Sequence, residues 1–461
     1  MKVSRKLVLT ILVPVLLGSA IRARAGTIDA VWNGGTGNWN VATDWTPNGV
    51  PNNGGGNSYN VTIDSSGTDL VSLNINATIA SLTLGGTAGS STLQSLANTA
   101  ETLAVTGATA IKQTGNLSFA NSSTVNLEGG LTIAASGQIN INGATIATIT
   151  GSVNNSGQFN TGFSGGGNTV TVTGAFTNNT GAALQVEGSG DVVKVASLTN
   201  SGTVTIDSGG TLNLTAQPNG ITDVPAGSTL TVAGTLMAGS ASGLAKLTSV
   251  EGTLDLENGK TTSVTPTGGT LKVASGGTLE LSGSVASTTT LSITGAVNNS
   301  GSFTTGFAGG STNKVNVSGA FTNNAGGSLA IAQGSGSTDV MNVASLTNSG
   351  TVTIGAGGTL NLTAQPNGIT DVPAGSTLTV TGTLNAGSAN GLAKLTSVEG
   401  LLDLQNGKTT SVTPTGGTLT IASGGTVELS GNTASTITLS ITGAVNNSGS
   451  FTTGFGGGPT R

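Results

Sequence analysis

Short runs of alternating apolar and polar residues fill the chain from about residue 68 onward. In the runs at 203–206, 229–232 and 278–281, every second residue is Val, Ile or Leu, and the residues between them are Thr or Glu. A strand places successive side chains on opposite faces, so each run has one face for a core and one for solvent. The runs begin about eight to ten residues apart, between Gly-Gly, Ser-Gly or Asn-Gly turns. This pattern predicts many short strands and almost no helix.

The last two thirds of the chain repeat one module. The segment 198–250 recurs at 346–398 with five changes in 53 positions, an offset of 148 residues. The start of the module, Val-Asn-Asn-Ser-Gly at 153–157, returns at 297–301 and at 445–449. Long-period repetition is typical of architectures in which each unit buries its apolar face by stacking on its neighbours.

Two all-β folds fit alternating runs: antiparallel hairpins in a sandwich or barrel, and parallel coils in a β-solenoid. We predict a single-stranded parallel β-helix with tandem modules of about 148 residues, because a closed barrel does not grow by duplicating such a segment. Coils of roughly 20–25 residues would give about 17–20 coils stacked at roughly 4.8 Å. The Asn-Asn-Ser-Gly segments at 154–157, 298–301 and 446–449 are expected in turns.

The expected core includes eight residues in two matching sets. They are Leu212, Leu214, Leu230 and Val232, and their copies Leu360, Leu362, Leu378 and Val380.

The pattern divides the chain into six segments. They are a signal peptide (1–25), a Trp-containing N-terminal cap (26–67), divergent solenoid coils (68–150), a first module (151–294), a second module (295–442) and a truncated start of a third (443–461). In the signal, Lys2, Arg5 and Lys6 precede an apolar run, and Ala23-Arg24-Ala25 places small residues where a signal peptidase cleaves. The apolar run is too short for a membrane-spanning helix.

Composition narrows the chemistry. The 461 residues include 76 Gly but no Cys and no His, which excludes disulfides, thiolate zinc sites and His-based nucleophile activation. Removing the signal leaves nine basic residues against 19 acidic ones. A surface of that sign is a poor partner for nucleic acid or anionic lipid, so neither is expected as a partner.

Several N-terminal motifs resemble those of secreted bacterial β-helical surface proteins. Residues 31–39 read Val-Trp-Asn-Gly-Gly-Thr-Gly-Asn-Trp, followed by Asp44-Trp45, Gly-Val-Pro at 49–51 and Val-Thr-Ile-Asp at 61–64. Ala-Ser-Leu-Thr-Leu-Gly-Gly at 80–86 fits the same group, which includes autotransporter-like passengers, haemagglutinin-like adhesins and PEP-CTERM-type surface proteins. The resemblance implies export and a parallel β-helix, and it implies no defined ligand. We expect a departure from that group at the C-terminal end, with neither a membrane barrel nor a sorting helix with a basic tail, and no means of anchoring is predicted.

Trp32, Trp39 and Trp45 are the first candidate site. Their rings would stack on sugars if exposed, but we favour a cap that covers the first coil, with each indole N–H on a partner.

The densest acidic spot is Glu251, Asp255 and Glu257. A calcium site or an acid/base pair there is the alternative to a solvated acidic face, which we favour. The second module reads Glu399, Asp403 and Gln405, one carboxylate fewer. Asp223 and Asp371 follow Pro-Asn-Gly turns and are expected at a turn or strand edge.

Two functional alternatives remain beside a structural or adhesive protein. A β-helix polysaccharide lyase or hydrolase needs clustered carboxylates with a cation, and Lys246 and Lys260, repeated as Lys394 and Lys408, are its best candidates. A Thr-faced ice-binding protein would use Thr203, Thr205, Thr229 and Thr231, although outward Thr is also an ordinary strand residue.

We predict a secreted or cell-surface, non-enzymatic structural or adhesive protein. No residue is assigned as catalytic, cofactor-binding or metal-binding, and no cofactor is expected. The expected partners are a surface glycan or a host or matrix protein. Residues 439–455 reproduce 291–307 closely, as an interrupted repeat. We expect either a fragment of a longer surface protein or an open last coil that allows self-association.

Overall fold

The chain is a parallel β-helix, as its alternating runs predict. The computed structural model describes residues 26–454, apart from 97, 284–286, 307–309, 311, 406 and 432–435, so the proposed signal at 1–25 lies outside the described residues. Within them the one helical element is the 3-10 turn η1 (Ala42–Asp44). Strands of successive coils pair in parallel, and antiparallel strand pairs are confined in this part of the chain to β1–β3, β25–β26 and β42–β43.

The coils have three faces, and one of them is an unbroken sheet. This continuous face has eighteen strands: β2 (Thr36–Asn38), β5 (Thr68–Leu73), β8 (Ser90–Ser95), β11 (Gly115–Phe119), β14 (Gln138–Ile141), β17 (Gln158–Thr161), β19 (Ala183–Val186), β21 (Thr203–Ile206), β24 (Thr229–Val232), β28 (Thr253–Leu256), β31 (Thr278–Leu281), β34 (Ser302–Thr305), β36 (Ser328–Ile331), β38 (Thr351–Ile354), β41 (Thr377–Val380), β45 (Leu401–Gln405), β48 (Thr426–Ser430) and β51 (Ser450–Thr453). Its register steps range from 20 residues, at Gln138 and Gln158, to 34, at Thr36 and Leu70, and from β5 onward none exceeds the 26 at Thr203 and Thr229.

The other two faces are each interrupted twice. The first broken face contains β6 (Ala77–Ile79), β9 (Thr102–Val105), β12 (Thr124–Leu127), β15 (Ile146–Ile149), β18 (Thr169–Asn178), β20 (Val192–Asn200), β22 (Thr211–Leu214), β25 (Thr235–Ala238) and β26 (Ala241–Ser242); then β29 (Thr261–Val264), β32 (Thr288–Ile293), β35 (Thr312–Asn323), β37 (Val340–Asn348), β39 (Thr359–Leu362), β42 (Thr383–Ala386) and β43 (Ala389–Asn390); then β46 (Thr409–Val412) and β49 (Thr438–Ile441).

The second broken face shares the long strands β18, β20, β35 and β37, whose C-terminal halves turn onto it. Its other strands are β3 (Trp45–Thr46), β1 (Gly26–Trp32), β4 (Asn57–Ile63), β7 (Ser81–Leu84), β10 (Thr109–Ile111), β13 (Leu131–Ile133) and β16 (Val153–Asn155); then β23 (Asp223–Val224), β27 (Ser249–Val250), β30 (Thr270–Val273) and β33 (Ala296–Asn299); then β40 (Asp371–Val372), β44 (Ser397–Val398), β47 (Thr418–Ile421) and β50 (Ala444–Asn447).

Both interruptions fall at the same place in each module, which we call joint 1 (215–224 with 239–248) and joint 2 (363–372 with 387–396). At joint 1, β25 pairs backward with β22 but forward only with its own hairpin partner β26. The next strand of that face, β29, pairs only with β32. On the second broken face, the Gln217 side chain stands in for the missing strand, because its Oε1 accepts the Leu198 N–H at 2.9 Å.

The two excursions of joint 1 close against each other through backbone contacts. Ile221 N–H donates to Gly243 O at 2.7 Å, and Gly220 adopts φ +63° beside it. A Cβ on Gly220 would lie 2.1 Å from Gly243 O, so only Gly fits both the backbone conformation and the space. Gly368 and Gly391 repeat this contact at joint 2.

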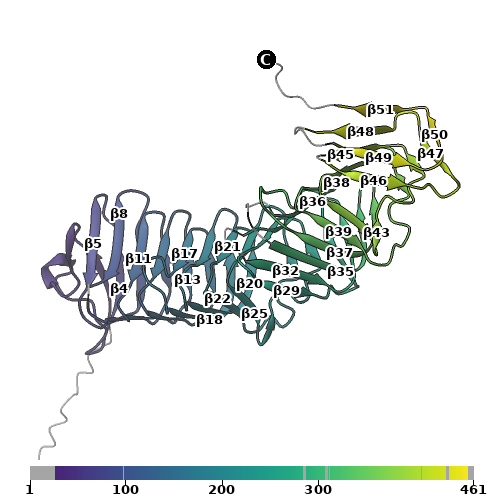
Figure 1. Ribbon diagram of the computed structural model, residues 1–461. Coiled ribbons are helices and arrows are strands. Elements are labelled where there is room, and N and C mark those ends of the chain that lie inside the picture. Colours follow the sequence, from purple (N-terminus) through teal and green to yellow (C-terminus); the bar gives the residue numbers. More distant parts are fainter. Residues whose placement is uncertain are drawn as a thin grey trace, which may run out of the picture.

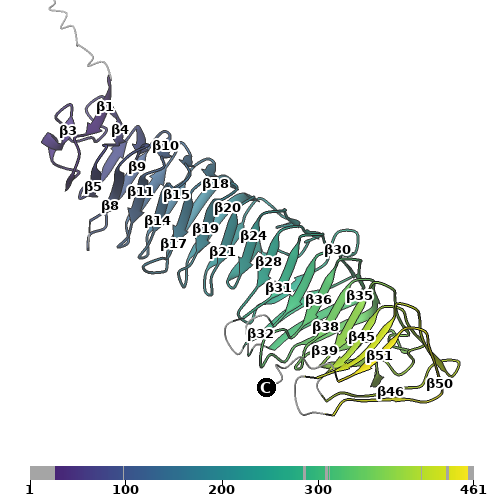
Figure 2. The ribbon, with the colours of Figure 1, turned by 90° about the horizontal axis from the view of Figure 1, so that it is seen from above.

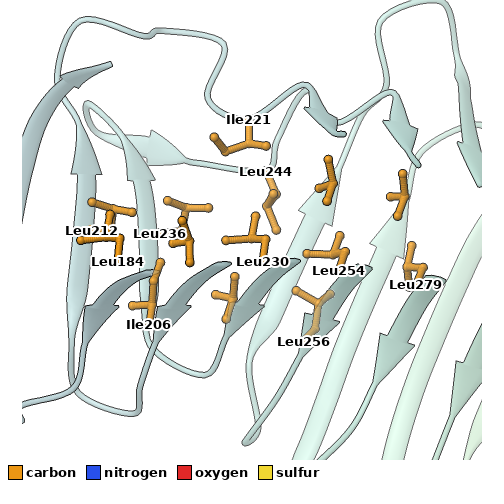
Figure 3. Close-up of a cluster of buried hydrophobic side chains, with 14 of the residues drawn as sticks. Leu184, Ile206, Leu212, Ile221, Leu230, Leu236, Leu244, Leu254, Leu256 and Leu279 are labelled. Atoms are coloured by element: carbon orange, nitrogen blue, oxygen red, sulfur yellow. The ribbon is translucent and has the colours of Figure 1, made fainter. Parts of the chain in front are cut away.

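Apolar side chains from the excursions keep the core continuous where the strands stop. Ile221 and Leu244 lie over Leu230, between Leu236 on one side and Leu254 on the other (Figure 3). Each of these side chains is buried. Joint 1 therefore loses strand pairing on two faces without opening the aliphatic core to water.

The joints coincide with changes in the direction of the rod. In Figure 1 the strands of the continuous face stand upright from β5 to β21, β35–β39 are oblique, and β45, β48 and β51 lie nearly flat. From above, the same rod is almost straight (Figure 2). A sheet that continues on one face, while the other two faces break, allows the axis to bend in one plane.

All eight predicted core residues are confirmed. Leu212, Leu214, Leu360 and Leu362 are fully buried, and the other four are no more than 4% exposed.

The prediction that the Asn-Asn-Ser-Gly segments form turns was wrong for their Asn residues. Asn155 ends strand β16, is fully buried, and is not among the residues with positive φ. Its Nδ2 donates to Asn178 Oδ1, and Asn178 Nδ2 donates to Asn200 Oδ1, both at 2.8 Å. Asn residues at one register position of consecutive coils therefore form an internal ladder, because strand ends inside a β-helix leave buried polar groups that amides can satisfy.

The last described coil exposes residues that earlier copies bury. Phe451 in β51 is 40% exposed, whereas Phe303 at the same place in β34 is fully buried beneath the following coil. Self-association through this coil stays a prediction.

Candidate binding surface at the joints

The three Trp side chains are packed together and are not available to a ligand. Trp45 stands edge-on to Trp32 and to Trp39, with ring centroids 5.0 and 4.9 Å apart, and all three are at most 3% exposed. The Trp39 indole N–H donates to Pro51 O at 2.9 Å, and that of Trp45 donates to Trp39 O at 2.9 Å. Burial of the ring faces excludes the sugar-stacking alternative for these residues.

The acidic spot lies on the outer side of the continuous face and is larger than the sequence showed. Asp255 in β28 is directly opposite Glu280 in β31, and Glu257 follows the end of β28. Asp207, which follows β21 two coils before β28, adds its charge to the same place. Glu280 and Asp207 were missed because they are distant in sequence and meet only through the coil register. Glu251 lies apart, next to Asp223 on the second broken face.

Burial and the crowding of these carboxylates hold the pKa of Glu257 well above its ordinary value. Burial, a hydrogen bond to Asp255, and the charges of Asp255, Asp207 and Glu280 raise the pKa of Glu257 to about 7. The second module carries Gln405 in this position, and its Nε2 donates to Asp403 as a protonated Glu257 does to Asp255. The amide therefore replaces a neutral carboxyl group, which favours a structural hydrogen bond over an acid/base pair.

Glu257 is expected to make stability depend on pH. Its pKa in the folded chain is above the ordinary 4.5, so its contribution is fully present below about pH 4.5 and is lost as pH rises through about 7. Solvent screens a group this exposed, so we expect a loss of only about 1 kcal/mol. The Glu257→Gln variant should show a flatter thermal midpoint between about pH 5 and pH 8. Exposed Glu251→Gln is the control, and an unchanged slope in Glu257→Gln would contradict the assignment.

A groove lies at each joint, between the hairpin that ends one part of the first broken face and the strand that begins the next. Groove 1, between β25–β26 and β29, has a volume of about 460 Å³, and groove 2, between β42–β43 and β46, about 270 Å³. Lys260 and Lys408 are the charged side chains among the described lining residues. Burial lowers the pKa of Lys408. Of the four candidate lysines, only these two line a groove, because Lys246 and Lys394 are not in either lining.

Two of the five differences between the modules face each other across a groove wall. Met237 pairs with Ser242 in the β25–β26 hairpin, and Asn385 pairs with Asn390 at the same place in β42–β43. The other lining residues are of the same types in both grooves, including the Leu, Thr and Ser residues and the Lys. Sequence reasoning missed this site, although two of the five changes, at 237 and 242, mark its position.

The remaining candidates have structural positions. Asp223 and Asp371 lie in the two-residue strands that begin new parts of the second broken face, as expected for strand edges. Thr203 and Thr229 pair side by side, as do Thr205 and Thr231. The second Thr column continues as Asp255 and Glu280, so the flat Thr array needed for ice binding is interrupted by charge.

The described residues contain no group of three or more side chains suited to hold a metal ion. In the same part of the chain, no helix is long and apolar enough to cross a bilayer.

Comparison with known proteins adds little to this geometry. No family model matches the chain, and no curated protein matches its sequence. The chain is similar to a crystal structure of a TibC-catalyzed hyper-glycosylated TibA fragment, with 16% identity over 92% of this chain and 94% of that chain, and a TM-score of 0.16. A likeness with that TM-score carries no argument, so fold and function rest on the residues themselves.

Proposed function

We propose that this chain is a secreted, non-enzymatic surface protein, a bent β-helical rod that presents repeated binding surfaces to glycans or to host or matrix proteins. The observation that carries the proposal is the duplication of the joint. Strand breaks, excursions, Gly contacts and the groove recur at 148 residues' distance. Repeated copies raise the avidity of an adhesive surface without any new contact.

The lyase or hydrolase alternative has weaker support. Catalysis of that kind needs carboxylates and a cation that converge on a substrate bond. The carboxylates of Asp255, Glu257 and Glu280 lie on the continuous face, whereas Lys260 lines groove 1 on another face of the coil. The second module also replaces Glu257 by Gln405, which no acid/base pair tolerates.

Beads coated with the full chain test the proposal. We expect them to adhere to surfaces that carry polysaccharide or matrix protein, and adhesion should fall when only one module is present. Incubation with polyuronates should release no unsaturated products. Failure of the beads to adhere to any such surface, or release of those products, would refute a non-enzymatic adhesive role.

A further inference from the structure

Groove 2 lies at one end of a row of amide side chains on the first broken face. Asn342 Nδ2 donates to Asn316 Oδ1 at 2.8 Å, Asn361 Nδ2 donates to Asn342 Oδ1 at 2.8 Å, and Asn385 Nδ2 donates to Asn361 Oδ1 at 2.9 Å. These four residues occupy one register position in β35, β37, β39 and β42, and each is half-buried. Asn385 also lines groove 2.

Each amide in the row keeps hydrogen-bonding capacity beyond the row itself. An Asn amide offers two donors and two acceptor lone pairs, and the row uses one donor and one lone pair of each middle member. Free donors and acceptors therefore recur along the outer face once per coil, at roughly 4.8 Å. A linear series of alternating donors and acceptors matches the hydroxyl groups of an extended glycan lying along the rod.

The first module lacks this row, although its backbone is the same. The corresponding positions hold Thr171, Lys194, Asn213 and Met237. Beside Met237, the buried Asn213 Oδ1 has no hydrogen-bond partner, whereas the equivalent Asn361 Oδ1 accepts from Asn385. The change from Met to Asn thus completes the amide row at the groove, and Met at that place is compatible with the fold.

Charge selects among glycans. Lys408 is half-buried in groove 2, and the described residues of that lining include no carboxylate to neutralise it. A volume of about 270 Å³ lies near the lower end of small-molecule sites, roughly 300 Å³, and suits one sugar unit rather than a folded partner. An ammonium group in such a groove favours an anionic group on that unit.

We propose that the amide row and groove 2 bind an extended polysaccharide, with the row contacting its hydroxyl groups and Lys408 contacting a uronic acid carboxylate. The inference rests on the proposed adhesive function and names its ligand class and site. Groove 1 shares the lysine but not the row, and is the weaker site.

Calorimetry of the full chain with hexagalacturonate, and with its methyl ester as the uncharged counterpart, tests the assignment. We expect hexagalacturonate to bind and the ester to bind at least about tenfold more weakly. Lys408→Gln should remove that preference. Asn385→Met, which installs the residue found in the first module, should weaken hexagalacturonate at least about tenfold, the loss expected for one or two unmade hydrogen bonds.

The first module supplies matched controls. Lys260→Gln should leave the stronger site unchanged, and Met237→Asn should strengthen the first-module site. The proposal would be overturned by any of three results. They are no binding of hexagalacturonate, equal binding of the ester, or wild-type affinity in both Asn385→Met and Lys408→Gln. Loss of adhesion to a matrix protein alone in these variants would also overturn it in favour of a protein ligand. Beads whose adhesion survives in the double variant would refute this site and leave the adhesive function standing.

Discussion

A Leu230→Asp variant is expected to lose several kcal/mol of stability and to unfold the coils around joint 1. Leu230 is 3% exposed in β24, between Val204 and Leu254 of the neighbouring coils. Its side chain also lies beneath Ile221 and Leu244, which close the joint (Figure 3). An Asp there would place an unpaired charge inside an aliphatic core. The thermal midpoint and hydrogen exchange of residues around the joint measure the effect.

Two variants give this prediction its controls. Thr229→Asp changes the preceding residue of the same strand, which points outward between Thr203 and Thr253, and should cost little. Leu378→Asp changes the copy in the second module and should move the loss of exchange protection to joint 2. An unchanged midpoint in Leu230→Asp would mean that the strand faces the other way.

Breaking the internal Asn ladder is expected to have the second largest effect. Asn178 is fully buried, accepts a hydrogen bond from Asn155, and donates to Asn200 and to Thr203 O at 2.9 Å. Asn178→Leu removes these bonds and leaves the buried partners unsatisfied, at a cost of roughly 2–3 kcal/mol. A lowered denaturation midpoint, with faster exchange of the amides near residues 155 and 200, would show it.

The outer amide row is the matched comparison. Asn342 makes the same kind of side-chain bonds as Asn178 but is half-buried, so water can replace them in Asn342→Leu. We expect that variant to lose less than about 1 kcal/mol. Equal losses in the two variants would show that burial does not distinguish the ladders.

The fold was predictable because alternation and repetition are local properties of the sequence. Thr-Leu-Thr-Val at 229–232 specifies which side chains enter a core whatever lies beside it. The joints were not predictable in the same way. The sequence around Gln217 and Gly220 does not indicate that strand pairing breaks on two faces there and continues on the third. Such a break depends on which strands find partners in the next coil.

The candidate site was predictable only in parts. Lys260 and Lys408 were identified as candidates, but they were grouped with acidic residues that lie on another face. Asn316, Asn342, Asn361 and Asn385 are between 19 and 26 residues apart and form a row only through register. Irregular coil length hides such columns from sequence inspection, since no fixed period connects their members.

The joints also determine how the rod responds to a pulling force. Hydrogen bonds between coils run along the rod axis, so three sheets share a tensile load through most of its length. At joints 1 and 2 the continuous face is the one sheet that crosses, and on the other two faces isolated hydrogen bonds, such as Thr265 N–H to Ala245 O, take the place of strand pairing. The excursions at 215–224 and 239–248 hold spare chain length beside that weak section. Under tension, the rod would therefore straighten and lengthen first at two fixed points, and the modules between them would stay folded.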